Sequence, residues 1–297
     1  MQFFHKSAPA PAKVNFFLNI TGVRPDGYHL LHTLMHKIEL VDEVILSIKK
    51  RTHVDVGTQA QVALSLSGYP IPDQGLNTAQ KAVELFWAHI GRKDDCANIH
   101  IKKNIPDQAG LGGGSSDAAT TLLLMNEAYD NMVSQSELIF LAKQIGADVP
   151  FFLGSSASIC TGIGEKTEPV YAYSDVPMLI IKPRQGVSTA QAYARIDMRN
   201  TLSNTEKSIH ETSSMISSDD AIDGVNRIKQ TQHLWSNDFQ EFALEDVPIL
   251  AEIQEFMKKN GAFYSALSGS GSAWFGCFDQ KNECLRAYDL AREIFVS

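Results

Sequence analysis

The sequence predicts an α+β fold with two domains. Segments with strand patterns and segments with helix patterns alternate in both halves of the chain, which is typical of this class. The length of 297 residues is sufficient for two domains, each with its own core. A polar stretch over Glu165–Asp175 separates the halves, and we therefore place the domains at 1–165 and 166–297.

The first third of the chain is rich in strand signals. β-branched, aromatic and alternating apolar residues predict strands at 12–21, at 34–49 (one or two strands), at 62–68 and at 97–106. Turn-forming residues in RPDGYH, at 24–29, predict a turn after the first strand. A helix is expected at 77–90, because its apolar residues have helical spacing, Asn77 suits the N-cap and Gly91 suits the C-terminal stop.

The middle of the chain predicts two helices and a further strand. The helices are expected at 115–129 and 136–145, the second one opened by Ser136 and closed by Gly146. Residues 148–152 leave that helix, and a strand is expected at 155–162.

The last third alternates in the same way. The expected elements are a buried strand at 178–183, an amphipathic helix at 247–260, a strand–glycine turn–strand unit at 263–278 and a helix at 281–295. Residues 200–224 are rich in Ser, Thr, Asp and Glu, so we expect a mobile surface segment there.

The charge balance argues against some classes of partner. With 26 basic and 34 acidic residues the net charge is -8, so the chain has no general attraction for nucleic acid or an anionic membrane. The four cysteines form no CxxC pair and no zinc spacing. Since no signal-peptide core and no apolar membrane-spanning segment is visible, we expect a cytoplasmic protein with reduced thiols.

A glycine-rich run, PDQAGLGGGSSDAA at 106–119, lies between a predicted strand and a predicted helix. Glycine lets the backbone approach a ligand closely, and a helix N-terminus offers unpaired N–H groups to phosphates. The run matches neither GxxxxGK[ST] nor GxGxxG. The alternative is a flexible linker or a tight turn. The proposed phosphate-binding residues are Pro106, Asp107, Gln108, Ala109, Gly110, Leu111, Gly112, Gly113, Gly114, Ser115 and Ser116.

Two charged residues and a second glycine turn are weaker candidates. A kinase needs a group that accepts the proton of the attacking hydroxyl and positive charge near the phosphoryl group. Asp148 and Lys13 would meet both needs if they lie together. The alternatives are a solvent-facing Lys13 and a turn or cap role for Asp148. SGSGS at 268–272 is either a simple hairpin turn or a second loop near the phosphates.

Three motifs resemble those of the GHMP small-molecule kinases in order and spacing: PAKVN at 11–15, PDQAGLGGGSSDAA at 106–119 and ALSGSGSAWF at 266–275. The resemblance implies an N-terminal ATP-binding domain like domain 2 of ribosomal protein S5, a ferredoxin-like C-terminal domain and an active site between them. It also implies ATP as phosphoryl donor, with Mg²⁺, although the sequence does not identify the metal ligands.

The segments at 11–35 and 145–153 resemble, more narrowly, the 4-diphosphocytidyl-2-C-methyl-D-erythritol kinases. This family resemblance implies phosphorylation of the 2-hydroxyl of a substrate with a cytidine diphosphate group, in the non-mevalonate route to isoprenoid precursors. By position, Asp148 is implied to be the general base and Lys13 the active-site lysine, and Asn15 a polar contact in the same pocket.

The same resemblance assigns the cytidine end of the substrate to Tyr28 and His29, with Tyr193 as a weaker candidate for the second stacking ring. Gln108 departs from the family pattern, in which the third loop position is Gly or Ala. At this position Gln108 either crowds the mouth of the loop or contacts the nucleotide.

Two other functions compete with this one. The first is a homoserine- or mevalonate-type kinase, against which the Tyr–His pair of RPDGYH argues. The second is an S5-like RNA-binding module without catalysis, against which the net charge of -8 and the absence of a basic stripe argue.

Overall fold

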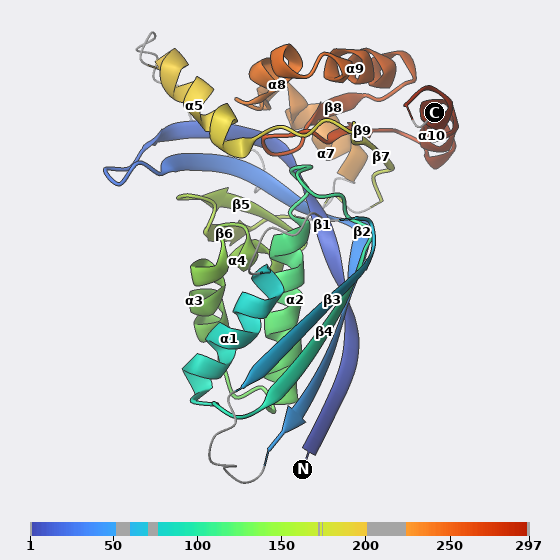
Figure 1. Cartoon of the computed structure of the whole chain (residues 1–297). Coiled ribbons are helices and arrows are strands. Elements are labelled where there is room, and N and C mark those ends of the chain that lie inside the picture. Colours follow the sequence, from blue (N-terminus) through green and yellow to red (C-terminus); the bar gives the residue numbers. More distant parts are fainter. Residues whose placement is uncertain are drawn as a thin grey trace. The chain divides into compact units, whose positions relative to one another are not determined.

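The computed structural model describes residues 2–51, 60–70, 77–171, 173, 175–200 and 224–295. Helices and strands occur along the whole described chain (Figure 1), which confirms the α+β class. The described cysteines are all free thiols. Within the described residues, no helix has the length and apolar character needed to span a bilayer.

The chain forms two compact units that interleave along the sequence. Unit 1 comprises Met1–Lys13, Lys37–Asp107 and Gly112–Ser155, and unit 2 comprises Val14–His36, Gln108–Leu111 and Ser156–Ser297. The two units are sets of residues that contact one another more than they contact the rest of the chain. They do not test the domain boundary expected between residues 165 and 166, which stays a prediction.

Two long paired strands, β1 (Gln2–Val23) and β2 (His29–Lys50), contribute to both units. They are longer than the sequence patterns, because backbone pairing also recruits polar residues on either side of the apolar runs. The expected turn joins them, where the N–H of Arg24 donates to the carbonyl of Tyr28 at 2.7 Å.

In unit 1, β4 (Cys96–Lys103) pairs antiparallel with β2 and parallel with β3 (Gln61–Gly68). Helices α1 (Thr78–Ile90), α2 (Gly113–Ala128), α3 (Gln135–Ile145) and α4 (Val149–Phe152) lie on one side of β3 and β4 (Figure 1). Most of α2 is buried, and it contacts the other three helices.

The helix ends of unit 1 test the capping predictions. Asn77 caps α1 and Gly91 ends it with φ 73, as expected. The prediction for α3 was wrong: its N-cap is Ser134, not Ser136. Ser134 Oγ accepts from the N–H of Glu137, and the Glu137 side chain accepts from the N–H of Ser134, so this capping box fixes the start.

In unit 2, β5 (Ala157–Thr161) pairs with β2 and with β6 (Lys166–Pro169). A second, antiparallel sheet has the order β7 (Met178–Ile181), β9 (Trp274–Cys277) and β8 (Tyr264–Leu267). The two strands β8 and β9 and the turn between them agree with the pattern at 263–278.

The helices of unit 2 are α5 (Thr189–Asn200), α7 (Gly224–Thr231) with the 3₁₀ turn η1 (Gln232–Leu234), α8 (Gln240–Asp246), α9 (Ile249–Lys259) and α10 (Lys281–Phe295). Leu179, Trp274 and Ile253 belong to the buried cluster that joins the second sheet to these helices. The expected mobile segment at 200–224 lies outside the described residues, apart from its two ends.

Candidate active site

Lys13 and Asp148 meet in unit 1. Lys13 lies on β1 with its side chain 5% exposed, and its Nζ is 3.7 Å from Oδ2 of Asp148. Lys13 is therefore a buried lysine and not a solvent-facing one. Asp148 directly precedes α4 and its carboxylate makes no capping hydrogen bond to that helix, so the carboxylate is available to another group.

The glycine loop reaches this pair at Gly112, the residue before α2. Its φ of 70° lies in the left-handed region that favours glycine. A β carbon at this position would come within 2.9 Å of Cζ of Phe152 and 3.1 Å of Cγ of Lys13. At Gly112 the start of α2 therefore contacts both Lys13 and α4, the helix that follows Asp148. Only glycine fits at this position.

The first turn of α2 presents the backbone of Gly113, Gly114 and Ser115. The first N–H groups of a helix have no partner within it, so they suit a phosphate. Ser116 is fully buried, and its Oγ has no hydrogen-bond partner among the described residues. Ser115 is half-buried, so it is the serine that offers a hydroxyl here.

A buried ionic cluster supports this turn, and the sequence analysis missed it. Nζ of Lys103 donates to Asp42 and, at 2.5 Å, to Oδ2 of Asp117. Asp42 also accepts from the backbone N–H of Asn104 and, at 2.8 Å, of Ile105. The end of β4 and the start of α2 are thereby tied together. The sequence does contain a signal for this cluster, because Lys103 lies at the end of the predicted strand and Asp117 follows the two serines of the loop.

The cluster holds one ammonium and two carboxylates. Burial raises the pKa of Asp117 to about 7, and the nearby Lys103 offsets only part of this effect. Burial alone would lower the pKa of Lys103, but the two carboxylates outweigh it and raise that pKa. Lys103 therefore stays charged, while one carboxylate is easily protonated.

The middle of the loop belongs to unit 2, where it contacts the second glycine turn. Oγ of Ser268 donates to the carbonyl of Gly110 at 2.9 Å, and the N–H of Ala273 donates to the carbonyl of Ala109 at 3.0 Å. The turn at 268–272 is therefore more than a hairpin connection. Gln108 adopts φ 50, which is uncommon for a residue with a β carbon.

Asn15 also lies in unit 2 and is fully buried. Its Nδ2 donates to Oγ1 of Thr33 at 2.8 Å, and the Thr33 hydroxyl donates to the carbonyl of Phe17. A β carbon at Gly269 would lie 3.5 Å from Oδ1 of Asn15. Asn15 is therefore a fixed polar group near the second glycine turn.

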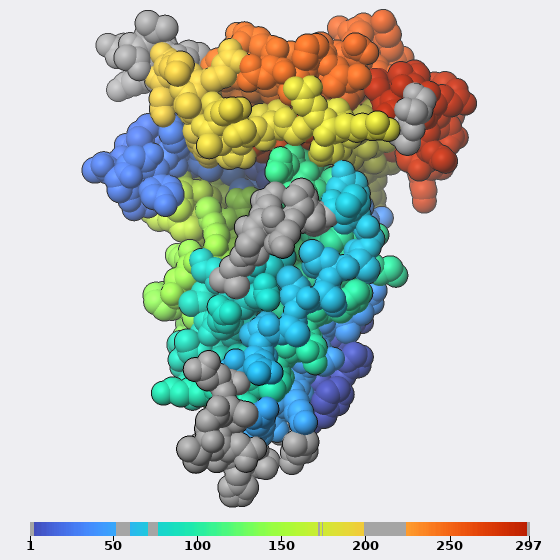
Figure 2. All heavy atoms as spheres, viewed as in Figure 1, coloured from blue at the N-terminus to red at the C-terminus, as the bar shows by residue number. Residues whose placement is uncertain are grey.

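The candidates for the cytidine end gather around the β1–β2 hairpin in unit 2. The His29 and Tyr193 rings stack with centroids 4.5 Å apart, and Nε2 of His29 is 2.7 Å from a carboxylate oxygen of Asp197. Tyr28 is 58% exposed, with the guanidinium of Arg24 5.8 Å from the ring centre. The hairpin, in blue, is at the molecular surface in Figure 2.

Comparison with known proteins decides the family. A family model for the GHMP kinases N terminal domain matches residues 77–156. The chain is 36% identical to a 4-diphosphocytidyl-2-C-methyl-D-erythritol kinase of Clostridium novyi (strain NT), over 94% of this chain and 93% of the relative. It belongs to this kinase family. A relative of the same description from Clostridium botulinum (strain Alaska E43 / Type E3) is 33% identical over 97% of this chain and 96% of its own length.

Solved structures agree with this assignment to the 4-diphosphocytidyl-2-C-methyl-D-erythritol kinases. A crystal structure of 4-(cytidine 5'-diphospho)-2C-methyl-D-erythritol kinase is 29% identical and has a TM-score of 0.74, covering 97% of this chain and 96% of that one. L. major mevalonate kinase, solved with R-mevalonate, is 14% identical with a TM-score of 0.70, covering 98% and 92%. At this low identity, the match to mevalonate kinase supports the fold of the chain and not its substrate. The chain is therefore a kinase with the GHMP fold, as the motifs predicted.

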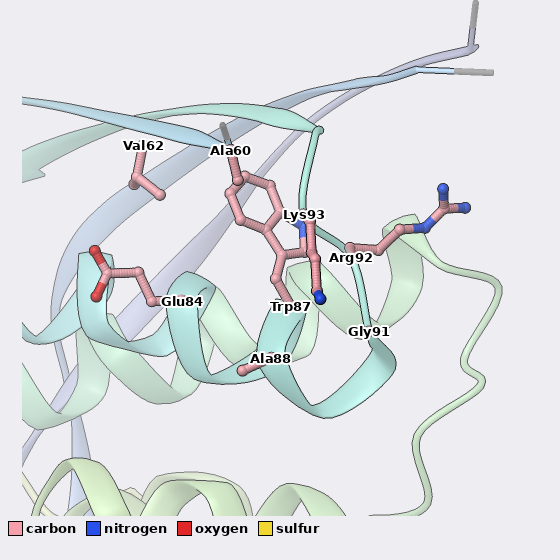
Figure 3. Close-up of a pocket in the computed structure, with 8 residues that line it drawn as sticks. All are labelled: Ala60, Val62, Glu84, Trp87, Ala88, Gly91, Arg92 and Lys93. Atoms are coloured by element: carbon pink, nitrogen blue, oxygen red, sulfur yellow. The ribbon is translucent and has the colours of Figure 1, made fainter. Parts of the chain in front are cut away.

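Unit 1 of this kinase also has a pocket at the start of β3 (Figure 3). It holds about 350 Å³ and is bounded by β3, the last turns of α1 and residues 91–93. Trp87 lines it, and its Nε1 donates to the hydroxyl of Tyr129 at 2.8 Å. Val62 at the pocket and Gly68 beside Lys103 are separated by roughly 20 Å along the strand. This pocket is therefore not part of the candidate active site.

Protein ligands for a metal ion do not gather in the described parts of the chain: no group of three or more His, Cys, Asp or Glu side chains occurs there. Mg²⁺ usually binds through one or two carboxylates and the phosphates of a nucleotide, not through a protein cage. The expected Mg²⁺ stays a prediction.

Proposed function

We propose that this kinase transfers the γ-phosphoryl group of ATP to the 2-hydroxyl of 4-diphosphocytidyl-2-C-methyl-D-erythritol, in the non-mevalonate route to isoprenoid precursors. The observation that carries the proposal is the 3.7 Å approach of Lys13 to Asp148, with Gly112 of the glycine loop packed against Lys13. A proton acceptor, a positive charge and a phosphate-binding helix end are the parts that phosphoryl transfer requires.

In this proposal the loop Pro106–Ser116 holds the phosphates of ATP. The backbone N–H groups at the start of α2 and the Ser115 hydroxyl donate to the phosphate oxygens. The loop contains no lysine, so in this proposal the positive charge at the reacting phosphate comes from Lys13, whose side chain lies against Gly112. Mg²⁺ bound to the ATP phosphates would neutralise part of their charge.

Asp148 acts as the general base. Its carboxylate accepts the proton of the 2-hydroxyl as the oxygen attacks the γ-phosphorus. A new bond forms between that oxygen and phosphorus, the bond between the γ-phosphorus and the bridging oxygen breaks, and ADP leaves. The ammonium of Lys13 stabilises the oxygen as it becomes negative.

The acceptor is recognised through its cytidine end. Tyr28 offers an exposed ring for stacking on the base, while His29 and Tyr193 supply polar and aromatic contacts. Asn15 is a further polar contact to the substrate, apart from its cytidine end. Relatives with 33–36% identity over nearly the whole chain, all described as kinases for this substrate, support this choice over homoserine or mevalonate.

The test is ADP release with four alcohols offered in turn: the cytidylylated methylerythritol, homoserine, mevalonate and galactose. We expect turnover with the first and background release with the other three. Turnover with homoserine or mevalonate alone would replace the proposed acceptor, and no turnover with any of them would remove the proposal.

A further inference from the structure

The last residue of the short helix α4 and the two residues after it present three successive carbonyls, and side chains from two other elements bind all of them. Nζ of Lys37, on β2, donates to the carbonyl of Phe152 at 3.1 Å and to that of Gly154 at 2.8 Å. Nε2 of Gln135, at the start of α3, donates to the carbonyl of Leu153 at 3.1 Å. All of these residues belong to unit 1.

The helix needs this support, because it has one turn only. The carbonyls of Pro150 and Phe151 accept from the N–H groups of Leu153 and Gly154, at 3.2 and 3.1 Å. At the other end, the side chain of Asp148 does not cap the helix. A four-residue helix has little stability of its own, so contacts from outside determine where its ends lie.

Lys37 is suited to this task. Its side chain is half-buried, and its Nζ lies 5.7 Å from the centre of the Phe151 ring. Burial lowers the pKa of Lys37. Lysine side chains can bind the carbonyls at the end of a helix. Lys37 does so from strand β2 and binds two of the three carbonyls.

We infer that Lys37, assisted by Gln135, is a positioning residue that holds α4 in place and thereby keeps the carboxylate of Asp148 near Lys13. The inference rests on the proposed role of Asp148 as general base. The arrangement leaves that carboxylate free for the reaction, because the helix is fastened at its opposite end.

The first test is Lys37→Met in the full-length enzyme. We expect kcat to fall roughly tenfold to hundredfold, because small displacements of a reacting group have effects of that size. The KM values for ATP and for the alcohol should stay within about twofold, since α4 does not bind either substrate in this scheme. Lys37→Arg should recover most of kcat, because the guanidinium can donate to both carbonyls.

A matched control is Lys81→Met. Lys81 also donates to a carbonyl near a helix end, that of Gln144 on α3, at 2.5 Å. This variant should keep the kcat of the parent enzyme. An equal loss of kcat in both lysine variants, or an unchanged kcat in Lys37→Met, would overturn the inference.

A double-mutant cycle separates the inference from the proposed function. In an Asp148→Asn background, Lys37→Met should lower kcat little further, because there is no base left to position. If Asp148→Asn is slow and Lys37→Met lowers kcat by the same factor in both backgrounds, the inference fails and the proposed function stands. If Asp148→Asn turns over normally, the proposed base is wrong.

Gln135→Met provides a second route if Lys37→Met does not fold. It removes one of the three carbonyl contacts, so we expect a smaller fall in kcat, of about threefold, with unchanged KM values. A change in KM for ATP without a change in kcat would contradict the positioning role.

Discussion

The backbone of Gly110 lies directly against the backbone of Ser268. A β carbon on Gly110 would be 2.0 Å from the carbonyl oxygen of Ser268, and Oγ of Ser268 donates to the carbonyl of Gly110 at 2.9 Å. Two glycine segments that are far apart in the sequence therefore form one piece of structure in unit 2. The proposed phosphate loop depends on this close approach.

We expect Gly110→Ala to raise the KM for ATP roughly tenfold, because the added methyl group must displace the loop. Gly91→Ala is the matched control. Gly91 has the same φ of 73°, but no described residue lies within 4 Å of its β-carbon position. Both variants bear the cost of about 1 kcal/mol for a left-handed alanine. Steady-state kinetics with varied ATP makes the comparison, and equal KM values in the two variants would contradict the steric argument.

Asp148→Asn should lower kcat at least roughly a hundredfold while both substrates still bind, as expected for loss of a general base. The change keeps the size of the side chain and its proximity to Lys13. Turnover and equilibrium binding of ATP and the alcohol are the measurements.

Asp130→Asn is a suitable control for that variant. Asp130 is exposed and has φ 59, a conformation that asparagine tolerates. Its kcat should equal that of the parent enzyme. Near-normal turnover of Asp148→Asn would remove Asp148 from the role of base.

Much of the fold could be predicted from local patterns. Asn77 and Gly91 mark the ends of α1 because capping depends on neighbouring residues only. Ser136 was the wrong cap because two serines lie close together, and only the one three residues before Glu137 can form the capping box. The helices α5, α7 and α8 were missed because their sequences are polar or short, and packing in unit 2 stabilises them.

The candidate site was predictable only in part. The glycine loop shows in the sequence because its composition is unusual. The pairing of Lys13 with Asp148 joins residues that are more than a hundred positions apart, so no local pattern reports it. Lys37, Lys103 and Asp117 were missed for the same reason: each acts through partners that only the folded chain brings near.

Tyr28→Ala should mainly weaken binding of the cytidine substrate. Since Tyr28 is 58% exposed, loss of its ring should change stability little, and stacking on a base contributes about 1–3 kcal/mol. We expect the KM for the alcohol to rise roughly tenfold, with the KM for ATP unchanged. The opposite pattern, a raised KM for ATP alone, would move Tyr28 out of the acceptor site.

Asp117→Asn should change how stability depends on pH. The pKa of Asp117 is raised from its usual value of 3.8 to about 7 in the folded chain, chiefly by burial. Between these values the folded state binds the proton more strongly than the unfolded state. The contribution of Asp117 to the free energy of unfolding is therefore present below about pH 4 and is lost as the pH rises through 7.

The amide introduced by the substitution does not titrate, while its oxygen can still accept from Lys103. We therefore expect the parent enzyme to lose about 3 kcal/mol of unfolding free energy relative to the variant between pH 5 and pH 8. Urea unfolding at both pH values measures the difference, and parallel curves for the two proteins would show that Asp117 is ionised throughout.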